Sequence, residues 1–273
     1  MKKKSIVITL ALVGACLVQY ASAETKPLKA LLLTGGCCHD YAAQKDLLKK
    51  GIEARGNIIV DQIHTDDTSS KPNLPIYGLP EYSKGYDVVI HNECAADISD
   101  DKIVKGVISP HQAGTPAVNL HCAMHSYRAE KFKKPVKETG TPSSQWFEFV
   151  GIQSTSHGPK KPVSIVFVDK KHPITKPLGD WVTSDEELYN NVTVFPTAHP
   201  LATGEQLGKT AVVTWTNDYK GTRVFNTSIG HFNETISDPR YLDLVTRGLL
   251  WVCGKLDDEG NIVEGYEASI TKK

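Results

Sequence analysis

The feature that most constrains the fold is a continuous apolar segment, residues 28–34, followed at once by two glycines. A segment with no polar face is typical of a strand buried on both sides of a parallel sheet. Residues 41–55 carry a helical apolar stripe instead, which ends at Gly56. The same alternation continues with strands expected at 58–63, 86–91 and 116–120 and a helix at 98–113. It predicts βαβ units and an α/β fold with a mainly parallel central sheet.

The second half of the chain is less regular. Residues 129–162 break the pattern and are expected to form an excursion over one end of the sheet. A strand is expected at 163–168, a hairpin pair at 211–215 and 222–228, and a closing helix at 239–253 with Asp238 as its N-cap. No internal repeat interrupts this order, so one domain is the simplest organisation.

Residues 1–23 have the pattern of a secretory signal peptide. Three lysines precede an apolar stretch that is short for a membrane span, and Ala21-Ser22-Ala23 matches a cleavage site. A lipid anchor at Cys16 is the alternative, although cleavage after Ala23 fits the long apolar run better. The expectation is a periplasmic or secreted protein, with residues 24–273 as a single domain, a core at about 28–254 and no membrane contact after signal removal.

The charge balance gives no sign of a charged partner. The chain has 31 basic and 31 acidic residues, and no basic run occurs beyond the N-terminus, so a nucleic-acid partner is not expected. The partner we expect is a small molecule. Five cysteines remain after residue 23, too few for a disulfide scaffold, and their odd number leaves at least one free.

Reactive side chains collect where the expected strands end. In an open parallel sheet, ligands bind at the carboxyl ends of the strands. The residues found there form four groups: Gly35-Gly36-Cys37-Cys38-His39-Asp40, His91-Asn92-Glu93-Cys94, His121-Cys122-Ala123-Met124-His125 and Gly230-His231. A single histidine at such a place often only satisfies a loop carbonyl, whereas a cluster favours a functional site.

One chemistry for this cluster is a metal site. Neutral imidazole suits Zn²⁺ and similar divalent ions, and a carboxylate can complete the shell. His121 and His125 have the i, i+4 spacing that puts two rings on one helix face, provided that the helix begins at His121. The expected metal ligands are His39, His121, His125 and His231, with Glu93 and Asp40 nearby.

The other chemistry is a cysteine nucleophile. Cys122 follows a buried strand and precedes a helix, the setting of a nucleophile elbow, and His231 would be its base with Glu234 as the orienting group. A buried or disulfide-bonded Cys122 is the competing interpretation. Adjacent cysteines rarely bond each other without strain, so a bridge from Cys37 or Cys38 to Cys94 or Cys122 is also open.

Several motifs together resemble the trehalose-utilisation, or ThuA-like, family. They occur in the family's order over about residues 28–254: Leu33-Thr34-Gly35-Gly36 with His39-Asp40, Tyr86-Asp87-Val88-Val89-Ile90, Leu120-His121, His125-Ser126-Tyr127-Arg128, His172-Pro173-Ile174, Asp185-Glu186-Glu187-Leu188-Tyr189, Trp215-Thr216, Gly221-Thr222-Arg223-Val224-Phe225 and Gly230-His231. The resemblance implies a flavodoxin-like three-layer sandwich of the class I glutamine amidotransferase type and a role in carbohydrate metabolism. Family members generally have a small residue at the elbow, so Cys122 is a departure.

Three functions follow as hypotheses. The first is an isomerase, lyase or hydrolase of a sugar, glycoside or keto-sugar, in which His121, His231, Glu93 and Cys122 are catalytic candidates. The second is a non-catalytic carbohydrate-binding protein that uses the same pocket, and the third is a Cys122–His231 thiol hydrolase. Residues expected to contact the sugar are Asp40, His125, Arg128, Glu187, Tyr189 and Trp215. The sequence does not fix the substrate or the oligomeric state.

Overall fold

The computed structural model describes residues 25–79, 81–128 and 132–268. The expected signal peptide at 1–23 lies outside these residues. Among the described helices, none is long and apolar enough to cross a membrane.

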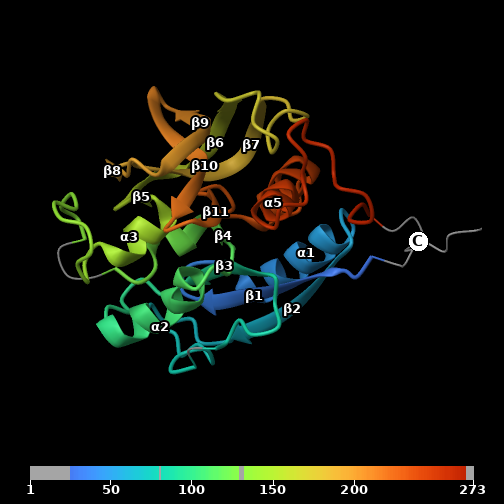
Figure 1. The fold of residues 1–273 in the computed structure, drawn as a ribbon. Helices are drawn as coiled ribbons and strands as arrows, with labels where there is room; N and C mark the ends of the chain where they lie inside the picture. Colours follow the sequence, from blue (N-terminus) through green and yellow to red (C-terminus); the bar gives the residue numbers. More distant parts are fainter. Residues whose placement is uncertain (1–24, 80, 129–131, 269–273) are drawn as a thin grey trace, which may run out of the picture.

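One large mixed sheet organises the chain (Figure 1). Its nine strands lie in the order β2-β1-β3-β4-β11-β10-β9-β6-β7, and a separate two-stranded sheet pairs β5 with β8. The strands are β1 Leu28–Gly36, β2 Ile58–Thr65, β3 Val88–Cys94, β4 Ala117–Leu120, β5 Ile152–Gln153, β6 His157–Phe167, β7 Trp181–Tyr189, β8 Thr193–Val194, β9 Ala198–Gln206, β10 Lys209–Tyr219 and β11 Thr222–Thr227. The helices are α1 Tyr41–Glu53, α2 Asp101–Gln112, the 3₁₀ helix η1 His121–His125, α3 Gln145–Val150, α4 Asn233–Ile236 and α5 Pro239–Val252.

The sheet has a parallel half and an antiparallel half. The strands β2, β1, β3, β4 and β11 pair in parallel, whereas β10, β9, β6 and β7 continue the sheet in antiparallel pairs. The parallel core and its helices confirm the expected flavodoxin-like α/β fold. The expected strands 58–63, 86–91 and 116–120, the strand at 163–168 and the hairpin are all present, but β7 and β9 were not anticipated. Neither strand has a regular alternation of apolar and polar residues, because β7 carries the run Ser184-Asp185-Glu186-Glu187 and β9 contains a proline and a glycine.

Two hydrophobic clusters separate the sheet from its helices, and together they make three layers. One cluster contains Leu48 and Ile52 of α1 with Leu249 of α5, and it packs on one face of the sheet. The other contains Val104 of α2 with Trp146 of α3, on the opposite face. Figure 1 shows α1 and α5 together on one side of the parallel strands and α2 and α3 on the other.

Local sequence signals set the helix boundaries. The side chain of Asp238 accepts a hydrogen bond from the backbone of Arg240, so α5 begins at Pro239 as expected. Asp100 caps α2 in the same way. The helix therefore begins at Asp101, three residues later than the apolar pattern predicted. Proline occurs inside α2, at Pro110 near its end.

Two buried histidines, His91 of β3 and His111 of α2, form a hydrogen-bonded network between the sheet and α2. The Nδ1 atom of His111 donates to the Thr115 carbonyl at 2.7 Å, and its Nε2 atom lies 3.1 Å from Nε2 of His91. The Nδ1 atom of His91 lies 2.8 Å from the Glu93 carboxylate, which also accepts from Tyr127. Burial, together with the charge of His91, lowers the pKa of His111 to about 3.

This histidine predicts a measurable pH dependence of stability. Unfolded His111 takes up a proton below its ordinary pKa of 6.5, whereas the folded group stays neutral down to about 3. The unfolded state therefore binds more protons in this window, and the free energy of unfolding falls as the pH falls. Replacing His111 with Gln should make this fall shallower by up to about 1.4 kcal/mol per pH unit between pH 6 and 4.

Urea unfolding at stepped pH values measures this slope. The control is Thr210→Ala, at an exposed residue of β10 that does not titrate, which should keep the wild-type slope. Equal slopes for wild type and His111→Gln would show that His111 does not carry the effect.

Candidate functional site

Two glycines at the end of β1 allow the loop that carries His39 to pack against the sheet. Gly35 and Gly36 both have positive φ, and a Cβ atom on Gly36 would collide with the backbone carbonyl of Cys94. The chain therefore runs directly across the end of β3 before α1 begins. Asp40 caps α1 by accepting from Ala43, so its carboxylate is partly committed to the helix.

A strained turn presents the second histidine. His121 follows β4 and has φ 41°, a left-handed conformation that is rare for a residue with a side chain. The sharp strand-to-helix turn thus centres on His121 rather than on Cys122, where the sequence interpretation placed it. Its Nδ1 atom donates to the Ser228 carbonyl at 2.7 Å, at the end of β11.

Three histidines from three different strand ends meet in one place. The ring of His39 lies 4.8 Å from that of His121 and 4.6 Å from that of His231, measured between centroids. One ring nitrogen from each residue lies within 4.8 Å of the others, so the trio can hold a metal ion. The expected convergence of these three histidines at one edge of the sheet is therefore present.

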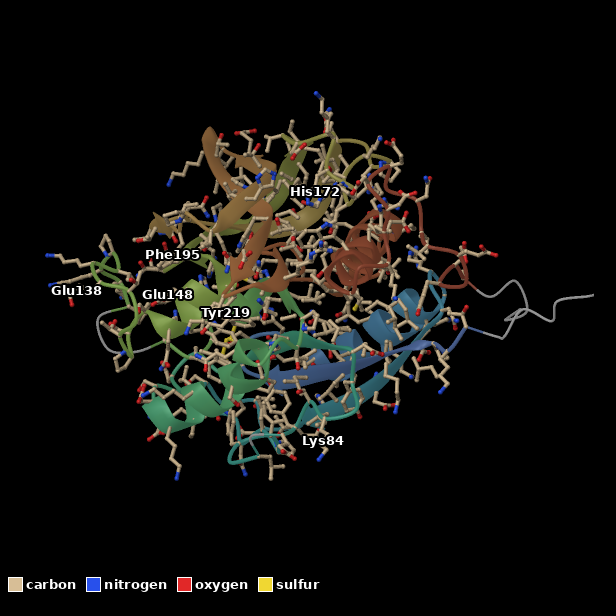
Figure 2. All side chains as sticks on the ribbon, viewed as in Figure 1. Lys84, Glu138, Glu148, His172, Phe195 and Tyr219 are labelled. Carbon is tan, nitrogen blue, oxygen red and sulfur yellow. A yellow bond between two sulfur atoms is a disulfide. The ribbon has the colours of Figure 1, made fainter. Side chains whose placement is uncertain are left out.

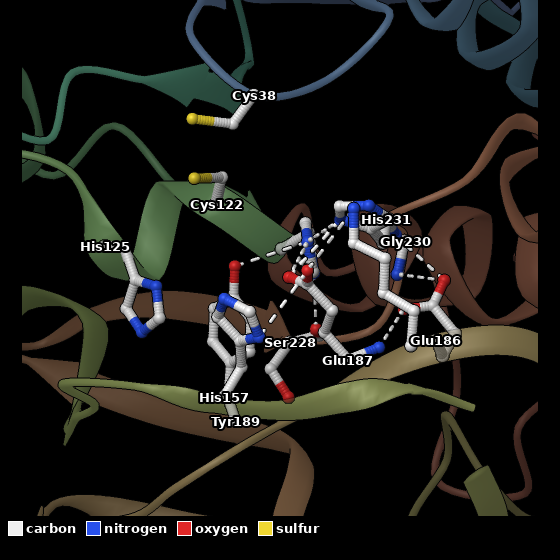
Figure 3. Close-up of polar contacts among 12 residues, drawn as sticks. Cys38, Cys122, His125, His157, Glu186, Glu187, Tyr189, Ser228, Gly230 and His231 are labelled. Carbon is white, nitrogen blue, oxygen red and sulfur yellow. Dashed lines mark hydrogen bonds and ion pairs between the residues drawn. The ribbon is translucent and has the colours of Figure 1, made fainter. Parts of the chain in front are cut away.

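Two adjacent carboxylates of β7 complete the cluster (Figure 3). An oxygen of Glu187 lies 3.6 Å from Nε2 of His121 and 3.3 Å from Nδ1 of His231. Glu186 is fully buried and accepts the backbone N–H groups of Gly230 and His231 at 3.2 and 2.8 Å. Glu186 thus fixes the backbone of the third histidine, while Glu187 faces the rings.

Protonation in the cluster follows from these contacts. Nδ1 of His121 donates to a carbonyl, so Nε2 is the nitrogen that faces the site, 3.2 Å from the hydroxyl of Tyr189. Burial, and then the charges of His121 and His231, lower the pKa of His39 to about 2. Burial alone would raise the pKa of Glu187, but hydrogen bonds and charges from His121 and His231 outweigh it and hold this pKa below its ordinary value.

The cluster forms part of the wall of a cavity of about 630 Å³. Tyr189 and His125 stack in parallel at 3.9 Å on one side of it, and burial raises the pKa of Tyr189 well above its usual range, so the phenol keeps its proton. Arg128, His157 and Lys160 bring basic side chains to the same cavity. A polar ligand of modest size fits this mixture of aromatic surface and hydrogen-bonding groups.

His125 is a neighbour of the trio rather than a member of it. The helix η1 is a 3₁₀ helix with three residues per turn, so residues four apart do not share a face. The ring of His125 instead bonds to Ser154 at 2.8 Å, and burial lowers its pKa well below the ordinary value. The expected i, i+4 pair with His121 therefore does not form.

Two other expected site residues lie in the interior. Trp215 is 1% exposed and donates to the Val150 carbonyl, so it is a core residue and cannot stack on a sugar. Glu93 is fully buried and faces His91 and Tyr127, because its position on β3 points away from the cavity. Neither places its side chain at the histidine cluster.

Cys122 is paired in the structure. It forms a disulfide with Cys94, and the adjacent Cys37 and Cys38 form a second one, so the bridge from Cys37 or Cys38 to Cys94 or Cys122 that the sequence left open is not present. A sulfur in a disulfide is not a thiolate, so the thiol hypothesis requires reduction. Glu234 lies on the short helix α4, and the group that faces His231 is Glu187.

Three residues at the site were not predicted from the sequence. Glu186, His157 and Lys160 lie on β6 and β7, the antiparallel strands that follow an irregular segment. His157 and Lys160 approach the other oxygen of Glu187 at 3.5 and 4.0 Å. An alternation of apolar and polar residues across 157–189 would have indicated these strands and their inward-facing residues. The run of charged residues in β7 obscures that alternation.

Comparison with known proteins supports the family resemblance. The sequence profile of the family described as "Trehalose utilisation" (ThuA) matches residues 29–252. Among curated proteins there is no match. A solved structure described as a ThuA-like protein from Parabacteroides merdae is 18% identical, with a TM-score of 0.62 over 89% of this chain and 98% of the other.

Two further solved structures share the fold. A protein described as ThuA-like from Bacteroides uniformis is 19% identical, with a TM-score of 0.57 over 89% of this chain and 98% of the other. A Thermoplasma acidophilum protein described as part of a GMP synthase is 9% identical, with a TM-score of 0.53 over 84% and 94%. The last likeness supports the glutamine amidotransferase-like architecture. With the profile covering most of its length, the chain belongs to the ThuA, or trehalose-utilisation, family.

Proposed function

We propose that this protein is a secreted or periplasmic enzyme that acts on a sugar, glycoside or keto-sugar through a divalent metal ion, such as zinc, held by His39, His121 and His231. The observation that carries the proposal is the meeting of three imidazoles beside Glu187, at the wall of a cavity that is lined by Glu187, His39 and His231. Three imidazole nitrogens are a donor set that suits zinc and would leave its fourth position open to a substrate oxygen, with Glu187 adjacent.

The second contact of His121 supports this assignment. Histidines that ligate metals usually donate their other ring N–H to a carbonyl or carboxylate, which fixes the ring and directs the free lone pair inward. His121 does this through the Ser228 carbonyl. The low pKa of His39 keeps that ring neutral, as a ligand must be.

The remaining groups suit acid–base work on a polyhydroxylated substrate. A bound metal ion supplies polarisation of a sugar carbonyl or hydroxyl oxygen. Glu187 stays ionised, so its carboxylate accepts a proton from the substrate, while Tyr189 holds its own proton and donates a hydrogen bond. Arg128 and Lys160 orient substrate oxygens from the cavity wall.

Metal binding is the first prediction. Full-length protein stripped with chelator should bind one Zn²⁺ per chain in isothermal titration calorimetry. His121→Ala and His231→Ala should each weaken this binding by on the order of 100-fold or more, because each removes a ligand.

The control is His172→Ala, at a histidine that is labelled in Figure 2 and that packs against Trp251 of α5. It should bind zinc as wild type does. Unchanged affinity in His121→Ala, or no binding by the wild-type protein, would remove the metal from the proposal and leave metal-free acid–base chemistry.

Turnover is the second prediction. Incubation with a panel of disaccharides and keto-glycosides in deuterated water, followed by NMR, detects bond cleavage or isotope exchange next to a carbonyl. Glu187→Gln should lower the rate by about 10²–10⁴-fold, the usual effect of losing a general base. Glu205→Gln, the same change at an exposed glutamate of β9, should leave the rate unchanged.

The outcomes separate the enzyme from a binding protein. Sugar binding without turnover, with affinity unaffected by His231→Ala, would identify a non-catalytic carbohydrate-binding protein. Equal rates in Glu187→Gln and wild type would remove Glu187 from the chemistry.

A further inference from the structure

Four cysteines lie together beside the histidine cluster, and the proposed sugar chemistry does not use them. The disulfides Cys37–Cys38 and Cys94–Cys122 stand next to each other, and Sγ of Cys37 lies 3.5 Å from Sγ of Cys94. All four residues line the same cavity as the histidines. Figure 3 shows Cys38 and Cys122 on one side of the site, beside the group formed by Glu187 and His231.

The two cysteine pairs differ in exposure. Cys38 is exposed and Cys37 is partly buried, whereas Cys94 is 2% and Cys122 is 6% exposed. A thiol reagent from solution therefore meets the Cys37–Cys38 pair first. Cys37 can pass electrons on to the buried pair, because its Sγ atom lies 3.5 Å from Sγ of Cys94.

The Cys37–Cys38 disulfide, the outer of the two pairs, lies on backbone with an unusual conformation. Cys38 has φ 83°, in the left-handed region that residues with side chains seldom adopt. Gly36, packed on the Cys94 carbonyl, sets the approach of this loop to β3. Strained backbone of this kind persists where the surroundings enforce it, and it is often linked to function.

We propose that Cys37–Cys38 is the entry point of a thiol–disulfide exchange relay that carries two electrons from an external dithiol to Cys94–Cys122. This activity is independent of the proposed sugar chemistry. Its partner is defined by chemistry alone, as a small molecule or protein with two neighbouring thiols.

The relay balances in four exchanges. A thiolate of the dithiol attacks Sγ of Cys38, which breaks the Cys37–Cys38 bond and leaves Cys37 as a thiolate. The second thiol of the reductant then breaks its mixed disulfide with Cys38, so the reductant leaves as a disulfide. Cys37 attacks Sγ of Cys94, which forms Cys37–Cys94 and releases Cys122.

The last exchange restores the outer pair. The Cys38 thiolate attacks Cys37, which re-forms Cys37–Cys38 and releases Cys94. One dithiol has become a disulfide, and one buried disulfide has become two thiols. The relay thereby places a free Cys122 sulfur beside His39, since ligand atoms of these two residues and Cys94 lie within 4.8 Å of one another.

Timed alkylation tests the relay. Full-length wild-type protein is treated with one equivalent of dithiothreitol, quenched with N-ethylmaleimide and mapped by peptide mass spectrometry. The label should accumulate on Cys94 and Cys122. In Cys37→Ser/Cys38→Ser, reduction of Cys94–Cys122 should slow by about tenfold or more, because the intramolecular step is lost.

A single variant traps the intermediate. Cys38→Ser cannot complete the last exchange, so its peptide map should contain Cys37–Cys94 with the label on Cys122. Cys253→Ser, which removes the one unpaired cysteine among the described residues, should behave as wild type. The relay is refuted if wild-type label stays on Cys37 and Cys38, if the double variant is reduced at the wild-type rate, or if Cys38→Ser forms no Cys37–Cys94 bond. None of these readings depends on sugar turnover or zinc.

Discussion

The parallel pairing of β4 with β11 is the constraint on which the site depends. In this register Leu120 lies opposite Thr227, so the two chains leave the sheet side by side. His121 can then donate to the Ser228 carbonyl, and its other nitrogen lies 3.3 Å from Nδ1 of His231. A shift of the register by one residue would reverse the faces of these side chains and separate the rings.

The antiparallel half of the sheet supplies the negative charge that this group of imidazoles needs. Glu186 and Glu187 are consecutive residues of one strand, yet one holds backbone N–H groups and the other faces the rings. Buried carboxylates are stable only when hydrogen bonds or charges compensate their desolvation. The two halves of the fold therefore depend on each other at the site, although they differ in sheet type.

The sequence predicts the parallel half well, because buried strands and amphipathic helices leave strong periodic signals. It also predicts that His39, His121 and His231 meet, since the topology alone brings strand ends to one edge. The sequence-based prediction is wrong for Trp215 and Glu93. The side of the sheet that each side chain faces depends on the pleat and register of its strand, which the composition does not reveal. The i, i+4 argument fails for His125 because a 3₁₀ turn replaces the expected α-helix, and the β7 carboxylates depend on long-range pairing.

The two ends of the described chain lie close together, far from the cavity. The side-chain amide of Asn57 donates both to the Thr25 carbonyl and to the Gly265 carbonyl, at the edge where β1 begins (Figure 1). The histidines follow the opposite end of β1. A carrier attached at residue 25 or 268 would therefore be joined at the edge of the sheet opposite the histidines.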